Sequence, residues 1–259
     1  MVETTRRAGI EGPDRLLLDL SRIGSNWEPP SSLSTAFICA AVSVMLPCEQ
    51  DPVGSRRVNV TGTLAVCEPL VRRGVHVVFL STNQVFDGSV AHRRADDATC
   101  PTSEYGRQRA EVEATLLALP GVVTVVRFGK LFEPGDPLLL GWVRDLRGGR
   151  EIHPFADLVL APLSVRFAVE VLLRVADRGV RGIVQASADR DVNYADVARH
   201  LAQRVGAPAE LVQPTTSLSA GLPQHCIPKH ATLDTSRLRD ELGLKPPDVW
   251  ATIDEVLEL

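Results

Sequence analysis

Tyr105 and Arg109 stand four residues apart in a polar segment, which follows an apolar run that ends in the hydroxyls of Ser81 and Thr82. Side chains one helical turn apart lie on the same helix face, so a phenol and a cation at this spacing can touch. The cation can favour the phenolate, while a nearby hydroxyl binds the same substrate oxygen. These residues therefore indicate carbonyl reduction, with Tyr105 as acid, Thr82 as hydrogen-bonding partner and Arg109 as cation.

The segments around these residues alternate between strand-like and helix-like patterns. We expect buried strands at residues 15–20, 36–41, 77–82, 122–126 and 182–186, and helices at residues 52–73, 103–119, 138–146, 165–176 and 194–205. Gly74 is placed to end the first of these helices, and Asn193 to cap the last. Strands and helices in alternation predict an α/β fold with a doubly wound parallel sheet.

Several separate motifs carry a resemblance to a known family. They are CEQDP at 48–52, NVTGT at 59–63, STNQVFDG at 81–88, YGRQRAEVE at 105–113, VR at 126–127 and TLDTSR at 232–237. These motifs follow one another in the order found in the extended short-chain dehydrogenase/reductase family. The chain resembles that family, in the branch of the dTDP-4-dehydrorhamnose reductases. The resemblance implies a Rossmann-like fold, an NAD(P)H cofactor and reduction of a 4-keto nucleotide sugar by Thr82, Tyr105 and Arg109.

The sequence departs from that family's pattern around the implied substrate pocket. Arg109 stands where the family has lysine, and a guanidinium group is planar and bulkier than an ammonium group. Asn83 and Gln84 replace the aspartate and tyrosine that contact the sugar, so we expect these two amides to bind a different pattern of hydroxyls. Ile227 replaces an arginine that contacts the diphosphate, which leaves Lys229 as the nearest cation for that contact.

The resemblance also implies a set of cofactor-binding residues. They are Arg6, Arg7, Asp19, Leu20, Ala40, Ala41, Tyr105 and Arg109. The two N-terminal arginines would bind the 2′-phosphate of NADP, since no acid stands there to hold a ribose diol. The Asp-Leu pair would flank adenine, and the two small alanines would let a strand end approach the ribose. NADP is therefore the expected cofactor, and NAD the second choice.

The family normally opens with a strand and a glycine-rich turn whose backbone amides bind the cofactor pyrophosphate. In this sequence Gly9 and Gly12 follow the basic turn instead of preceding it, and Arg15 stands where a third glycine is needed. We therefore expect a plain loop at these glycines and a sheet without the family's first strand and helix. We assign residues 1–132 to the NAD(P)-binding domain and residues 133–259 mainly to a substrate-binding region, interleaved with the last sheet strands.

Each of these functional interpretations has a structural alternative. For Tyr105 it is a half-buried packing residue, and for Arg109 a solvated arginine paired with Glu113. For Asn83 and Gln84 it is an ordinary turn after a strand. At the level of the whole chain, the alternative to an enzyme is a non-catalytic scaffold that binds a nucleotide sugar or dinucleotide and regulates a partner enzyme.

Composition argues against several other classes of protein. The 259-residue chain has a net charge of −4, so no overall positive field favours nucleic acid or an anionic membrane. No apolar run approaches the length needed to cross a bilayer. The five cysteines form no Cys-x-x-Cys pair, and the histidines show no metal-ligand spacing. We therefore expect a cytoplasmic protein with a nucleotide sugar as its partner and no metal, and we leave a homodimer open.

Overall fold

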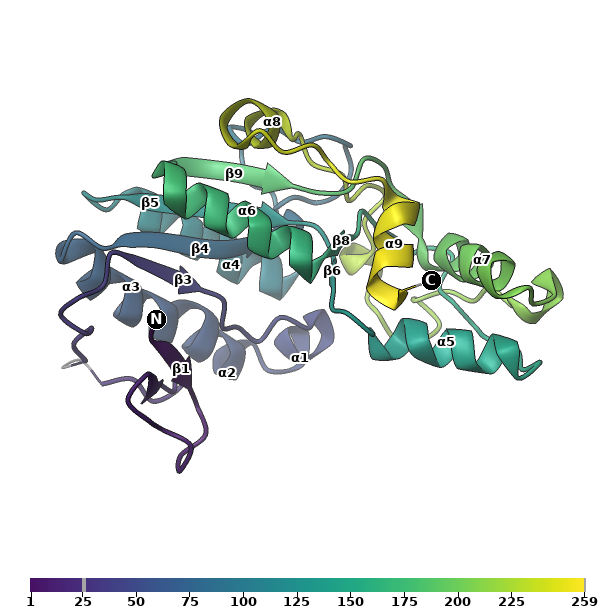
Figure 1. The fold of residues 1–259 in the computed structure, drawn as a ribbon, viewed down its shortest axis with the longest axis horizontal. Coiled ribbons are helices and arrows are strands. Elements are labelled where there is room, and N and C mark those ends of the chain that lie inside the picture. Colours follow the sequence, from purple (N-terminus) through teal and green to yellow (C-terminus); the bar gives the residue numbers. More distant parts are fainter. Residues whose placement is uncertain (25–26, 259) are drawn as a thin grey trace.

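The computed structural model describes residues 1–24 and 27–258, and its centre is a parallel sheet with strand order β3-β4-β5-β9 (Figure 1). The strands are β3 (Thr35–Ile38), β4 (His76–Thr82), β5 (Val123–Phe128) and β9 (Gly182–Ala186). β5 is buried along its whole length and β4 almost so, as expected for apolar runs in a parallel sheet. The strand predicted at residues 36–41 ends earlier and is only half-buried, because β3 lies at the edge of the sheet.

Helices cover both faces of this sheet. Phe79 of β4 packs with α3 (Thr63–Arg72) and α4 (Glu104–Leu117), whereas its neighbour Val78 packs with α6 (Val165–Arg178). Successive side chains of a strand point to opposite faces of the sheet, so a continuously apolar strand can be buried on both faces. The predicted α/β fold with a doubly wound parallel sheet is therefore confirmed.

The helix predicted at residues 52–73 is one helical run with a π-helical turn in its middle. The run comprises α2 (Pro52–Arg56), the π-turn (Arg57–Gly62) and α3, and it follows the short α1 (Met45–Gln50). Asp51 caps its start, because the carboxylate accepts a hydrogen bond from the Gly54 N–H. Gly74 follows its end with a φ of 77°, which confirms the predicted stop.

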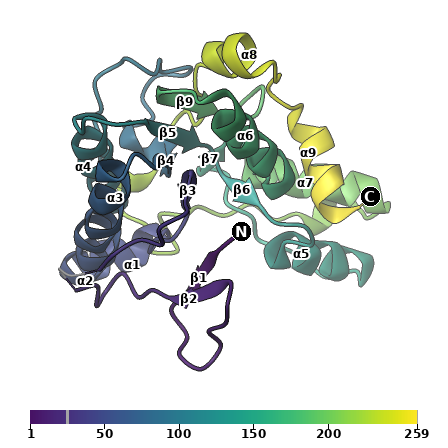
Figure 2. The same ribbon diagram turned by 60° about the vertical axis from the view of Figure 1, so that its left-hand side comes forward.

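The N-terminal residues form a small ribbon instead of joining the central sheet. β1 (Glu3–Thr5) pairs in parallel with β2 (Arg15–Leu17), and within the described residues neither strand pairs with β3 (Figure 2). The prediction of a buried strand at residues 15–20 is wrong, because all of β2 is exposed and the chain becomes half-buried only from residue 18. Gly9 and Gly12 lie in the loop between β1 and β2, which confirms the plain loop predicted there.

Three C-terminal helices gather beside one end of the sheet (Figure 1). They are α5 (Pro137–Arg147), α7 (Tyr194–Val205) and α9 (Val249–Leu257), and they share one apolar cluster. The predicted cap at Asn193 is confirmed, since its side chain and that of Asp196 each accept the other's backbone N–H. The division of the chain into two domains near residue 132 stays a prediction.

Short elements connect these helices to the sheet. β6 (Leu131–Phe132) pairs with β8 (Leu163–Ser164), β7 (Val159–Leu160) pairs with β10 (Val192–Asn193), and α8 (Ser236–Leu242) packs with α6. Single turns of 3-10 helix stand at Asn83–Val85, Ala209–Leu211 and Gln224–Cys226. Across residues 1–24 and 27–258, no helix has the length and apolar character required to cross a membrane.

Candidate active site at the carboxyl ends of the strands

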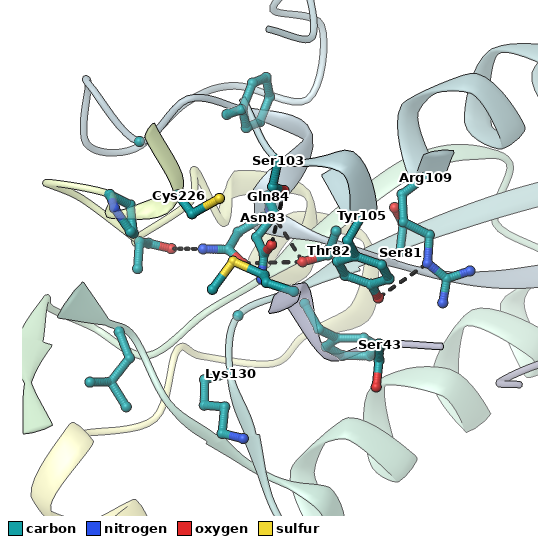
Figure 3. A pocket seen from close by; sticks show the side chains of 18 of the residues that line it. Ser43, Ser81, Thr82, Asn83, Gln84, Ser103, Tyr105, Arg109, Lys130 and Cys226 are labelled. Atoms are coloured by element: carbon teal, nitrogen blue, oxygen red, sulfur yellow. Dashed lines mark hydrogen bonds between the residues drawn. The ribbon is translucent and has the colours of Figure 1, made fainter. Parts of the chain in front are cut away.

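A cavity of about 540 Å³ opens where β3, β4 and β5 end. This edge of a parallel sheet is where open α/β folds bind their ligands. Six of the residues predicted for catalysis or binding line the cavity, namely Ala41, Thr82, Asn83, Gln84, Tyr105 and Arg109. The structure therefore brings the core of the predicted site together, and Figure 3 shows the last five of these side chains close to one another.

Tyr105 and Arg109 are in direct contact on the first turns of α4. The Arg109 Nε donates a hydrogen bond to the Tyr105 hydroxyl oxygen over 3.1 Å, and both side chains are buried (Figure 3). The guanidinium carbon also lies 4.9 Å from the centre of the Phe79 ring, within cation–π range. Arg109 thus faces the phenol and the sheet, and the alternative of a solvated surface arginine is wrong.

The start of α4 is placed by a close approach between two backbones. Ser103 caps the helix, because its hydroxyl oxygen accepts the Gly106 N–H over 3.1 Å. A Cβ atom on Gly106 would stand 2.2 Å from the Gln84 carbonyl oxygen, so only glycine lets α4 pack this tightly against the turn after β4. The residue after Tyr105 therefore sets how closely the phenol approaches Thr82.

Glu113 has a partner other than Arg109. Its carboxylate forms a buried ion pair with Arg127, with 2.7 Å between Arg127 Nη2 and Glu113 Oε2, and it accepts a hydrogen bond from the Ser81 hydroxyl. Arg127 also donates to the Gln185 side chain over 3.1 Å. Arg127 is thus held within the core by two side chains from different elements. Because Glu113 is engaged there, Arg109 remains directed at Tyr105, and its buried Nη1 has no hydrogen-bond partner among the described residues.

Thr82 ends β4 and also caps the 3-10 turn that follows. Its hydroxyl oxygen accepts the Gln84 N–H over 3.2 Å, and the hydroxyl lies 3.3 Å from the Asn83 Oδ1. The second of these contacts is long for an O–H···O hydrogen bond. The backbone contact fixes the oxygen at the cavity wall, while the hydroxyl proton can turn toward a bound oxygen atom.

Asn83 and Gln84 both line the cavity and are held by neighbouring segments. The Asn83 amide donates to the Ala231 carbonyl oxygen over 3.3 Å, and the Gln84 side-chain oxygen accepts from the Ser103 hydroxyl over 3.3 Å. These contacts keep the two amides at the wall of the cavity. Their role in binding a substrate stays a prediction, as does an ordinary role in the turn.

Five of the eight predicted cofactor residues do not line this cavity. Arg6, Arg7, Asp19, Leu20 and Ala40 are absent from its walls within the described residues. Asp19 accepts hydrogen bonds from the Ser21 hydroxyl and N–H, and these hold the pKa of its carboxyl below the ordinary value, with Arg22 and Arg6 contributing to the same effect. The predicted basic turn and the predicted adenine contact are therefore near each other.

Lys229 is exposed and does not line the cavity, although its neighbours Pro228 and His230 do. A different lysine, Lys130, stands in the wall just after β5 (Figure 3). The sequence analysis did not identify Lys130. The signal was present, because the strand before it was predicted and ligands of parallel sheets bind at the carboxyl ends of the strands. Ser43 and Tyr194 are two further wall residues that no sequence motif indicated.

Comparisons with known proteins agree with this architecture. The family model described as the RmlD substrate binding domain matches residues 32–259. The chain is 27% identical over 263 residues to a dTDP-4-dehydrorhamnose reductase of Mycobacterium tuberculosis. The alignment covers 95% of this chain and 84% of that protein. It is 30% identical over 218 residues to a probable dTDP-4,6-dihydroxy-2-methyloxan-3-one 4-ketoreductase of Streptomyces antibioticus, with 82% and 72% covered.

Two solved structures have a similar fold. MoeE5 in complex with UDP-glucose and NAD superposes with a TM-score of 0.79 at 21% identity, covering 99% of this chain and 89% of that one. A Bacillus anthracis dTDP-4-dehydrorhamnose reductase in complex with NADP gives a TM-score of 0.77 at 19% identity, covering 85% and 79%. Because the family model spans most of the sequence, the chain belongs to the RmlD-like nucleotide-sugar reductases of the extended short-chain dehydrogenase/reductase family.

Proposed function

We propose that this protein reduces the 4-keto group of a nucleotide sugar with a nicotinamide cofactor, NADPH in preference to NADH. The observation that carries the proposal is the hydrogen bond from Arg109 to the Tyr105 hydroxyl, in a cavity that Thr82 also lines. The names of the similar proteins support the reaction, since they include 4-keto sugar reductases from several bacteria. Structures of the same fold that hold NADP or NAD support the cofactor.

The chemistry assigned to this site is proton donation to a carbonyl oxygen. Tyr105 donates its hydroxyl proton to the oxygen while Thr82 provides a second hydrogen bond to it. The Arg109 guanidinium, already bonded to the phenol oxygen, stabilises the negative charge left on Tyr105. The reduced nicotinamide, when bound, supplies the hydride.

The residues at the cavity fit a dinucleotide. Arg109 Nη1 is a buried donor without a partner among the described residues, and a ribose hydroxyl oxygen would satisfy it. Ala41 and Cys39 leave room for a ribose at the end of β3, since both are small. Arg6 and Arg7 are the cations that we assign to the 2′-phosphate, and Asp19 and Leu20 are assigned to adenine.

A turnover assay with purified protein tests the proposal directly. Oxidation of NADPH is followed by absorbance in the presence of dTDP- and UDP-linked 4-keto-6-deoxy sugars, and the sugar product is identified by mass spectrometry. Oxidation that depends on the sugar, with a product two hydrogens heavier, supports the reductase. Saturable binding of a nucleotide sugar or NADPH with no turnover on any 4-keto sugar would instead favour the regulatory scaffold.

Location and assembly belong to the same proposal. We infer a cytoplasmic protein from the reaction's cofactor and from five cysteines that form no disulfide across the described residues. A homodimer stays a prediction, and light scattering of the purified chain measures it.

A further inference from the structure

Three side chains with metal-binding atoms meet in one cluster, and one of them, Cys226, lines the cavity. Glu49 lies on α1, while His225 and Cys226 lie on the 3-10 turn Gln224–Cys226, and Glu49 and Cys226 are 177 positions apart in the sequence. One ligand atom from each side chain lies within 4.8 Å of the other two. No spacing motif indicates this group, because only the fold brings the two segments together.

The distances are close to those of a metal-binding cluster. Cys226 Sγ lies 3.8 Å from Glu49 Oε1, and His225 Nε2 lies 3.9 Å from Glu49 Oε2. Ligand atoms bound tetrahedrally at zinc lie roughly 3.5 Å from one another, given bond lengths of about 2.0–2.3 Å. The His225 side chain is half exposed, so its ring has room to adjust toward the other two ligand atoms. Sulfur, imidazole and carboxylate together are a donor set typical of zinc.

The surroundings hold two of the three ligands in place. Glu49 Oε1 accepts the backbone N–H of Glu104 over 2.6 Å, which fixes the carboxylate against the start of α4. Cys226 is buried and also lines the cavity (Figure 3). Burial, reinforced by the Glu49 carboxylate, raises the pKa of Cys226 to about 11, so the metal-free thiol keeps its proton. A cation at this position would displace that proton and neutralise the acid.

We propose that Glu49, His225 and Cys226 form a binding site for a zinc-class divalent cation. On binding, the Cys226 S–H bond breaks, its proton goes to solvent, and the sulfur electron pair forms a bond to the metal. The bound cation ties the segment of residues 224–231, which forms part of the cavity wall, to α1 and to the first residue of the helix that carries Tyr105. The ordinary alternative is a thiol–carboxylate hydrogen bond with a histidine nearby, and it requires no metal.

The site is tested on the purified full-length chain with Zn²⁺ and Co²⁺. We expect one equivalent of Zn²⁺ to bind with release of about one proton above the buffer baseline. Co²⁺ should give a thiolate-to-metal charge-transfer band and the intense visible bands of tetrahedral coordination, because the metal then bonds directly to sulfur. Thermal unfolding should shift upward with Zn²⁺, since a ligand that binds only the native state stabilises it.

Matched variants identify the ligands. Cys226→Ser and His225→Ala should each weaken Zn²⁺ binding by more than about tenfold, and the first should remove the charge-transfer band. Glu49→Gln keeps an oxygen for the Glu104 N–H, so it removes the charge with little effect on the fold. Cys100→Ser and His153→Ala, outside the cluster, serve as controls and should bind like the parent chain. The proposal is overturned if the parent chain shows no stoichiometric binding, or if binding is unchanged in Cys226→Ser and His225→Ala.

Discussion

The Arg109 Nε donates its hydrogen bond to the Tyr105 hydroxyl oxygen from one helical turn away, over 3.1 Å, while its buried Nη1 has no partner among the described residues. One guanidinium group therefore contacts the Tyr105 phenol and also retains a buried N–H donor that is available to a ligand. The first two of the following predictions start from this pair.

Replacing Tyr105 by phenylalanine should abolish carbonyl reduction while leaving NADPH binding nearly unchanged. The substitution removes the proton donor but little volume, and general-acid groups contribute about 10²–10⁴-fold to rate. Tyr194→Phe is the matched control, because it changes the only other tyrosine, which lines the same cavity. Steady-state rates and fluorescence titration with NADPH give the two readouts. Turnover that survives in Tyr105→Phe would remove Tyr105 from the mechanism.

Arg109→Lys should leave the rate of reduction unchanged or raise it. The compact ammonium group reaches both the phenol and a ribose hydroxyl, and it keeps the positive charge that favours the phenolate. Arg109→Gln, which removes that charge, should lower kcat. If the lysine variant loses as much activity as the glutamine variant, the planar guanidinium is itself required and the charge alone does not explain its role.

Glu113→Gln should destabilise the protein by about 3–5 kcal/mol, because it leaves the buried Arg127 cation without its carboxylate. Equilibrium unfolding in urea measures the loss. Glu111→Gln on the same helix breaks the exposed ion pair with Arg56, and it should cost no more than about 1 kcal/mol. Similar small losses in both variants would show that Arg127 is satisfied without Glu113.

Replacing both Arg6 and Arg7 by alanine should weaken NADPH binding more than NADH binding. Each charge-assisted hydrogen bond lost to the 2′-phosphate is worth about 1.5–3 kcal/mol, and NADH has no such phosphate. Isothermal titration with the two cofactors measures the difference, and Arg22→Ala provides a control cation near Asp19. Equal losses for both cofactors would show that the basic turn does not select between them.

Lys130→Ala should raise the KM for the nucleotide sugar about tenfold or more, whereas Lys229→Ala should change it little. Only Lys130 lines the cavity, and a lost hydrogen bond to a charged group costs about 1.5–3 kcal/mol. The measurement is KM and kcat for the same sugar in both variants. A larger effect of Lys229→Ala would restore the sequence-based assignment of the diphosphate contact to Lys229.

The parts of the site that lie within one local element were predictable from the sequence. Tyr105 and Arg109 share a helix face, so spacing alone placed them together. Thr82 lies on another element, and it was assigned to the site from the end of its strand and the family resemblance. The Glu113 partner was not predictable in this way, because Arg127 comes from a different strand. The sequence spacing favoured Arg109, four residues before Glu113, as the partner of that carboxylate. Only the tertiary structure shows that Arg127 is the partner instead.

Burial was the weakest part of the sequence-based prediction. An apolar run predicts a strand, but whether that strand is covered depends on segments elsewhere in the chain. β2 has the expected extended backbone at Arg15–Leu17 and remains exposed, while β5 has the same kind of pattern and is buried throughout. The same limit applies to Lys229, whose exposure depends on how its loop lies against Gly88.

The close approach between the Gly106 backbone and the Gln84 carbonyl holds the helix that carries Tyr105 against the turn that follows Thr82. Asn83 and Lys130 line the cavity and are not part of this contact, so we expect substitutions there to alter which sugar is accepted while leaving the contact in place. Position 106 has no such freedom, since any Cβ atom would push the helix away from the turn. We therefore expect single substitutions on the walls to change substrate choice, and substitutions at position 106 to change the rate of reduction.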